Sequence, residues 1–176
     1  MASPNATTSK PTQRLQPSLL DRLTDLEPKR LTEAPEDRVL DKRALRAAVL
    51  RDLSWLFNAV DYTDQFSATE WPEVAKSVLN FGLPQLSGGY VSSVDIPRLE
   101  ATIRQTILLF EPRIIPASLR VTALLDGSIL DLHNQLSLSI NGLLWAQPVP
   151  LEIHLRTQID LEHNTVNVVD ASGSGI

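Results

Sequence analysis

The residues best placed to do chemistry lie in one short stretch, Phe110 to Pro116, where a carboxylate and a guanidinium flank a proline. Glu111 and Arg113 could pair with each other or with nearby backbone and lock a corner of the fold. They could also bind a partner protein, or Glu111 could act as a catalytic acid. Polar residues at helix ends usually satisfy terminal backbone groups, which favours the first role for the tripeptide considered alone. The rest of the sequence must decide among these three roles.

Other catalytic and metal chemistries find little support in the sequence. The chain has no cysteine, which excludes disulfides, thiolate zinc sites and cysteine nucleophiles. The three histidines, His133, His154 and His163, lack the helical spacing of common zinc motifs, so we expect no metal and no cofactor. Glycoside hydrolysis needs two carboxylates across a sugar cleft, and no second acid stands out beside Glu111.

The composition is that of an ordinary globular protein. Hydrophobic residues make up 43% and charged residues 21% of 176 residues, enough for one domain with a core. The net charge of −5 provides no basic footprint, which disfavours nucleic acid as the main partner. No apolar run reaches the length of a membrane span, and the first seventeen residues contain no apolar signal core. We therefore expect a cytoplasmic protein without direct membrane insertion.

Helices are expected to hold the Glu111 stretch from its N-terminal side. One helix should begin after Asp95 and end near Phe110, because Pro112 removes a backbone donor and restricts the residue before it. A second should run from about Asp41 to Ala59. Apolar residues at spacings of three and four define both helices. They are Ile96, Leu99, Ile103, Ile107 and Phe110 in the helix after Asp95, and Leu45, Ala48, Val49, Leu53, Leu56 and Phe57 in the helix from about Asp41. A shorter amphipathic segment, capped by Ser18, carries Leu19, Leu20, Leu23 and Leu26.

Strands are expected to follow the stretch, because the apolar period becomes two after Pro116. Four candidates fall at residues 118–125, 135–141, 149–161 and 166–169. We predict an α+β fold in which N-terminal amphipathic helices pack on one face of a C-terminal, mainly antiparallel sheet of about four strands. The short last strand is a candidate edge that a partner's strand could extend. Residues 1–17 are predicted to be a disordered tail, 18–170 a single domain and 171–176 a flexible tail.

Three segments appear in an order that resembles a known family. They are Arg51 to Asn58, then Phe81 to Pro84 followed by Leu86 and Ser87, and then the helix ending in Phe110-Glu111-Pro112-Arg113. Together they resemble TssE, the small baseplate subunit of bacterial type VI secretion systems. They are also similar to the baseplate wedge proteins of contractile-tailed phages, a family often labelled lysozyme-like. The resemblance covers roughly residues 18 to 170.

The resemblance implies a structural role rather than catalysis. Family members sit in the baseplate wedge around the inner tube, contact TssF and TssG, and offer a sheet on which the first sheath ring of TssB and TssC polymerises. It implies that Glu111, Pro112 and Arg113 match the family's Glu-Pro-Arg motif and bind partners in the wedge, with TssK and the inner tube protein as further candidates. It implies a place in the cytoplasm, at a baseplate docked on the inner-membrane complex. The alternative is a peptidoglycan-cleaving, lysozyme-like hydrolase that uses Glu111.

Overall fold

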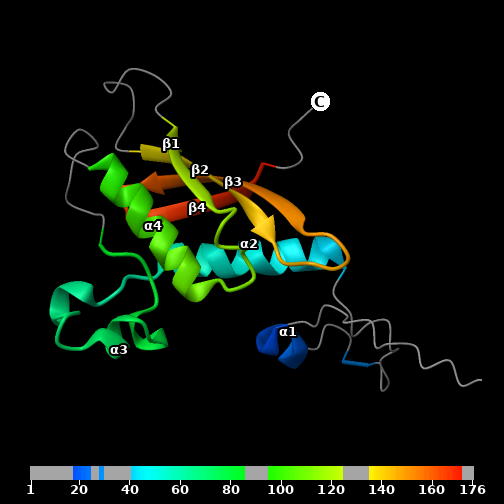
Figure 1. Cartoon of the computed structure of the whole chain (residues 1–176), viewed down its shortest axis with the longest axis horizontal. Helices are drawn as coiled ribbons and strands as arrows, with labels where there is room; N and C mark the ends of the chain where they lie inside the picture. The colour runs from blue at the N-terminus through cyan, green and yellow to red at the C-terminus, as the bar shows by residue number, and fades with distance from the viewer. Residues whose placement is uncertain (1–17, 25–27, 30–40, 86–94, 125–134, 172–176) are drawn as a thin grey trace, which may run out of the picture.

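Two long helices lie against one face of a four-stranded antiparallel sheet (Figure 1). The computed structural model describes residues 18–24, 28–29, 41–85, 95–124 and 135–171. The helices are α1 (Leu19–Leu23), α2 (Lys42–Asn58), α3 (Pro72–Ala75) and α4 (Ile96–Phe110), with 3₁₀ turns at Thr63–Gln65 and Val78–Asn80. The strands are β1 (Arg120–Leu124), β2 (Gln135–Leu144), β3 (Leu151–Asp160) and β4 (Thr165–Asp170). The predicted α+β class and four-stranded sheet are confirmed.

The two long helices begin and end where their sequence signals are. The carboxylate of Asp41 accepts a hydrogen bond from the Ala44 N–H (2.6 Å) and caps α2. Asp95 caps α4 in the same way through the Arg98 N–H (3.1 Å), and the helix ends at Phe110, two residues before Pro112. All six apolar residues predicted for the stripe of α2 are buried. In α4 the central Leu99, Ile103 and Ile107 are buried, whereas Ile96 and Phe110, at its ends, are partly buried and pack against the core. Within the described segments, no helix has both the length and the apolar character needed to cross a bilayer.

The sheet has the order β1-β2-β3-β4, and every neighbouring pair is antiparallel. Buried and exposed residues alternate along β3, so one face of the sheet enters the core and the other faces solvent. In Figure 1, α4 runs close to β1 and α2 close to β4, and both helices contribute to one apolar core. The helices thus cover a single face of the sheet, as the sequence predicts.

Several sequence expectations fall outside the described residues. They are the tail at 1–17, Leu26, the resemblance residues Leu86 and Ser87, His133, and all of the 171–176 tail except Ala171. Within the described part, α1 has no buried residue, and its three leucines are exposed. The amphipathic character predicted for α1 therefore does not come from packing into this core.

Thr157 is a polar residue in the centre of the buried face of β3. The residue is 1% exposed, and its hydroxyl oxygen has no hydrogen-bond partner among the described residues. A buried hydroxyl without a partner lowers stability, so Thr157→Val should raise the free energy of unfolding by about 1 kcal/mol. Urea unfolding would measure the change. The exposed Thr122 of β1 provides the control, because Thr122→Val should change stability by less than about 0.5 kcal/mol. An equal gain at both positions would point to strand propensity instead of the buried hydroxyl.

Candidate functional site

The corner that follows α4 is fixed by backbone hydrogen bonds to the end of β2. The Glu111 N–H closes the last turn of α4 by donating to the Ile107 carbonyl (2.8 Å). Beyond Pro112, the Ile115 N–H donates to the Leu143 carbonyl and the Trp145 N–H donates to the Arg113 carbonyl, both at 2.8 Å. A helix end and a strand end therefore hold the backbone of Glu111 and Arg113 between them.

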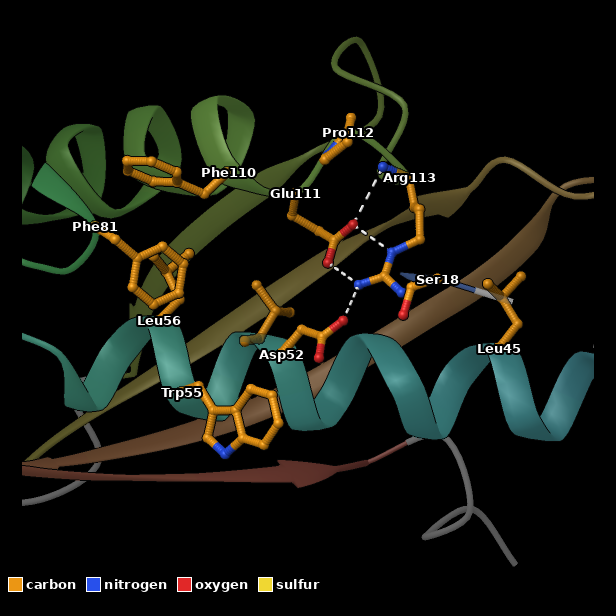
Figure 2. A pocket seen from close by; sticks show the side chains of 11 residues that line it. Ser18, Leu45, Asp52, Trp55, Leu56, Phe81, Phe110, Glu111, Pro112 and Arg113 are labelled. Carbon is orange, nitrogen blue, oxygen red and sulfur yellow. Dashed lines mark hydrogen bonds and ion pairs between the residues drawn. The ribbon is translucent and has the colours of Figure 1, made fainter. Parts of the chain in front are cut away.

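Glu111 and Arg113 form a two-pronged ion pair at this corner (Figure 2). Arg113 Nε donates to Glu111 Oε1 (2.6 Å), and Arg113 Nη2 donates to Glu111 Oε2. The Glu111 side chain is 3% exposed and the Arg113 side chain 24%. Burial alone would lower the pKa of Arg113, but its bonds and charge interactions with Glu111, and then with Asp52, outweigh burial and raise that pKa above its ordinary value. The two charges are thus locked together.

The ion pair continues through Asp52 on α2 to the N-terminal helix α1. Arg113 Nη2 also donates to Asp52 Oδ2 (2.5 Å), while Asp52 Oδ1 accepts from Arg51 (2.8 Å). Arg51 in turn donates to Asp21 Oδ1 (2.5 Å), and its guanidinium lies over the Trp55 ring, 5.0 Å from the ring centre. This ion-pair cluster contains three carboxylates and two guanidiniums, so it carries one net negative charge.

The attachment of α1 should depend on pH through Asp21. The hydrogen bond from Arg51 is the main cause that holds the pKa of Asp21 below its ordinary value of 3.8. A lowered pKa in the folded state means that the ion pair contributes fully above pH 3.8 and is lost as the pH falls below it. We therefore expect the amides of α1 to exchange faster in acid, as measured by hydrogen exchange corrected for intrinsic rates. Asp21→Asn should remove this acid-dependent step, and an unchanged step in that variant would contradict the assignment.

An open hollow of about 440 Å³ lies beside the ion-pair cluster. Its floor and walls are mostly apolar or aromatic, and the charged corner forms one side (Figure 2). The rings of Phe81 and Phe110 meet edge to face, 5.3 Å apart, and Trp55 borders the hollow with about half of its surface exposed. The residues that line the hollow are Ser18, Leu45, Asp52, Leu53, Trp55, Leu56, Phe81, Phe110, Glu111, Pro112 and Arg113.

The structure brings Glu111, Pro112 and Arg113 to the edge of this hollow, where their predicted partner-binding role stays a prediction. The sequence reasoning missed Asp52 as a member of the site. Asp52 falls at the seventh position after Leu45 and the fourth before Leu56, so it is an acid within an apolar helical stripe. That conflict with the helix pattern was the available signal, because an acid among core positions needs a cation.

The arrangement argues against Glu111 as a proton donor to a substrate. Both of its carboxylate oxygens accept hydrogen bonds from Arg113, and the residue is 2% exposed. A general acid must reach its substrate, and this carboxylate is turned toward its own chain. Among the described residues, no three His, Asp or Glu side chains are grouped so that they could hold a metal ion. The ion pair is suited to fixing the conformation of the corner that borders the hollow.

Fold and site together define a small α+β protein whose main feature is an internally paired corner beside an open apolar hollow. A scan against protein families matches residues 43–149 to the family described as baseplate wedge protein gp25. This range is more than half of the chain, and the chain therefore belongs to the gp25 family of baseplate wedge proteins. The searches of curated proteins and of solved structures gave no match.

The matched range shows which parts of the site belong to the family domain. It runs from the start of α2 to the turn after β2 and so contains Asp52, the Glu111 corner and α4. Helix α1 with Asp21, and strands β3 and β4, lie outside it. Membership supports a structural role in a phage-tail-like baseplate.

Proposed function

We propose that this chain is a TssE-type baseplate subunit of a type VI secretion system, a contractile injection machine. In this role it joins the wedge subunits and nucleates sheath polymerisation. Membership in the baseplate wedge family supports the structural part of the proposal. The ordered segments around Arg51, Phe81 and Glu111, which resemble TssE, support the assignment to a secretion system. The protein would work in the cytoplasm, at a baseplate docked on the inner-membrane complex.

The observation that carries the proposal is the open hollow beside an internally paired corner. Aromatic side chains at the edge of a fixed pocket are typical of the residues that dominate binding energy in protein interfaces. Trp55, Phe81 and Phe110 provide such an edge. The ion pair at Glu111 already holds the corner in one conformation without a partner. Binding would therefore cost little conformational entropy at this corner. We assign the hollow to TssF and TssG, with TssK and the inner tube protein as further candidates.

The sheet supports the second part of the proposal. Strand β4 lies at one edge of the sheet, and an edge strand can be extended by a strand from another protein. TssB and TssC, the sheath proteins, are the partners that we assign to the sheet. Sheath polymerisation could then begin on a protein that is already fixed in the wedge through its hollow.

The test of the hollow uses a residue that lines it and is half exposed instead of buried in the core. Trp55→Ser removes a half-exposed ring that borders the hollow, and Trp71→Ser removes a ring of similar exposure that does not line it. We expect Trp55→Ser to lose about tenfold or more in affinity for co-expressed TssF and TssG, and Trp71→Ser to lose little. Thermal melts of the isolated variants should remain close to wild type. A wild-type chain that purifies with neither subunit would contradict the assignment to this machine.

A further inference from the structure

Helix α1 turns its polar side toward the protein and its apolar side toward solvent. Ser18 and Asp21, three residues apart, are partly buried. The leucines lie on the other side, within about 100° of the helix surface. Their exposed fractions are 71% for Leu19, 44% for Leu20 and 74% for Leu23. A helix that covered its own core would show the reverse arrangement, so this leucine face is open to another molecule.

A single ion pair holds α1 in this orientation. Arg51 donates to Asp21 Oδ1 (2.5 Å), and among the described residues this is the one hydrogen bond that joins α1 to the rest of the chain. Arg51 is itself fixed, because it also donates to Asp52 and lies over the Trp55 ring. A helix of five residues is not stable alone in water, so its position depends on such contacts. The ion pair therefore presents the leucine face outward.

The leucine face adjoins the hollow that we assign to the wedge subunits. Ser18, the residue that caps α1, lines the hollow (Figure 2). Trp55, which lines it too, lies under the guanidinium that holds α1. A partner seated in the hollow would therefore lie next to α1. Because α1 precedes the matched range 43–149, this extension is not part of the family domain itself.

We propose that the leucine face of α1 is a second contact surface for the partner that occupies the hollow, and that it binds an apolar stretch of that partner. Leu19 and Leu23 are four positions apart and form one ridge, which such a stretch can cover. The pair of Asp21 with Arg51 sets where this ridge stands relative to the hollow. The inference rests on the assembly function proposed above and adds to it a contact outside the family domain.

The experiment measures the affinity of the full chain for co-expressed TssF and TssG. Leu19→Gln combined with Leu23→Gln removes the ridge, and glutamine retains a high helix propensity. Val78→Gln combined with Leu79→Gln is the matched control, because these side chains are 80% and 73% exposed and are not among those that line the hollow. Hydrogen exchange of the α1 amides in the wild-type chain, alone and with the two subunits, provides a second measurement.

We expect the leucine variant to bind about tenfold more weakly and the control variant to bind as wild type does, since only the first loses apolar area that binding buries. Both should melt as wild type does. The α1 amides should exchange more slowly in the complex, because binding covers the helix.

Equal or tighter binding of the leucine variant, or unchanged exchange of α1, would overturn the inference. So would a dimer of the free wild-type chain that the leucine variant abolishes, because a second copy would then cover the leucine face. If Trp55→Ser loses the subunits and the leucine variant does not, this inference alone fails. A wild-type chain that binds neither subunit would overturn the proposed function, and this inference with it.

Discussion

Replacing Arg113 with methionine should lower the free energy of unfolding of the isolated protein by about 3–5 kcal/mol, because the Glu111 carboxylate would remain buried without its cation. The Glu111 side chain is 3% exposed, and both of its oxygens accept bonds from Arg113. Methionine retains most of the length and apolar stem of arginine, so the loss would report mainly the charge. Urea unfolding followed by tryptophan fluorescence would measure it.

A second variant separates the ion pair from simple loss of packing. Glu111→Gln combined with Arg113→Met removes both charges, and this double variant should recover a large part of the stability lost in Arg113→Met. Arg98→Met, at an exposed position of α4, is the matched control and should cost less than about 0.5 kcal/mol. A loss for Arg113→Met no larger than that of the control would contradict the bracing role of the pair.

This stability effect determines how partner binding at the corner can be tested. A variant of Arg113 that loses TssF or TssG would also be a destabilised protein, so its loss would not locate an interface. In addition, Arg113 already makes its two-pronged hydrogen bond with Glu111. The sequence alone had left open that Arg113 binds a partner protein instead. Exposed residues around the hollow, such as Trp55, are better probes of binding because the fold does not depend on them in the same way.

Local signals predicted most of the fold. Asp95 marks the start of α4 and Pro112 its end, because helix capping and the missing proline N–H both act within one turn. The period of two along β3 reflects the burial of one face of that strand. The pairing of Asp52 with Arg113 joins residues 61 positions apart, and the contact of Asn58 with Val166 joins residues 108 apart. The spacing of α2 indicates that Asp52 needs a cation, but it does not say which one, and no local spacing pairs Asn58 with Val166. Both pairings depend on how α2 lies against the rest of the fold.

A second large effect is expected at Gly82, where the chain passes close to the end of α2. Gly82 has a φ of +143°, a conformation that residues with a side chain rarely adopt. A Cβ atom there would lie 2.5 Å from the Ala59 carbonyl oxygen. The same carbonyl accepts a hydrogen bond from the Leu83 N–H (2.9 Å), so it cannot move away without losing that bond. Backbone strain and steric overlap together predict that Gly82→Ala costs about 3 kcal/mol or more.

The glycine of β2 provides the control for this prediction. At Gly142 the nearest atom to an added Cβ is Ile114 Cγ2, at 3.6 Å, which is an ordinary contact, so Gly142→Ala should be neutral or raise stability by up to about 1 kcal/mol. Urea unfolding of both variants makes the comparison, and similar losses at the two positions would contradict the steric explanation. Gly82 precedes the buried Leu83 and follows Phe81, whose ring meets Phe110 at the hollow. A folded Gly82→Ala protein should therefore also bind TssF and TssG more weakly, since displacing this loop moves one wall of the proposed binding site.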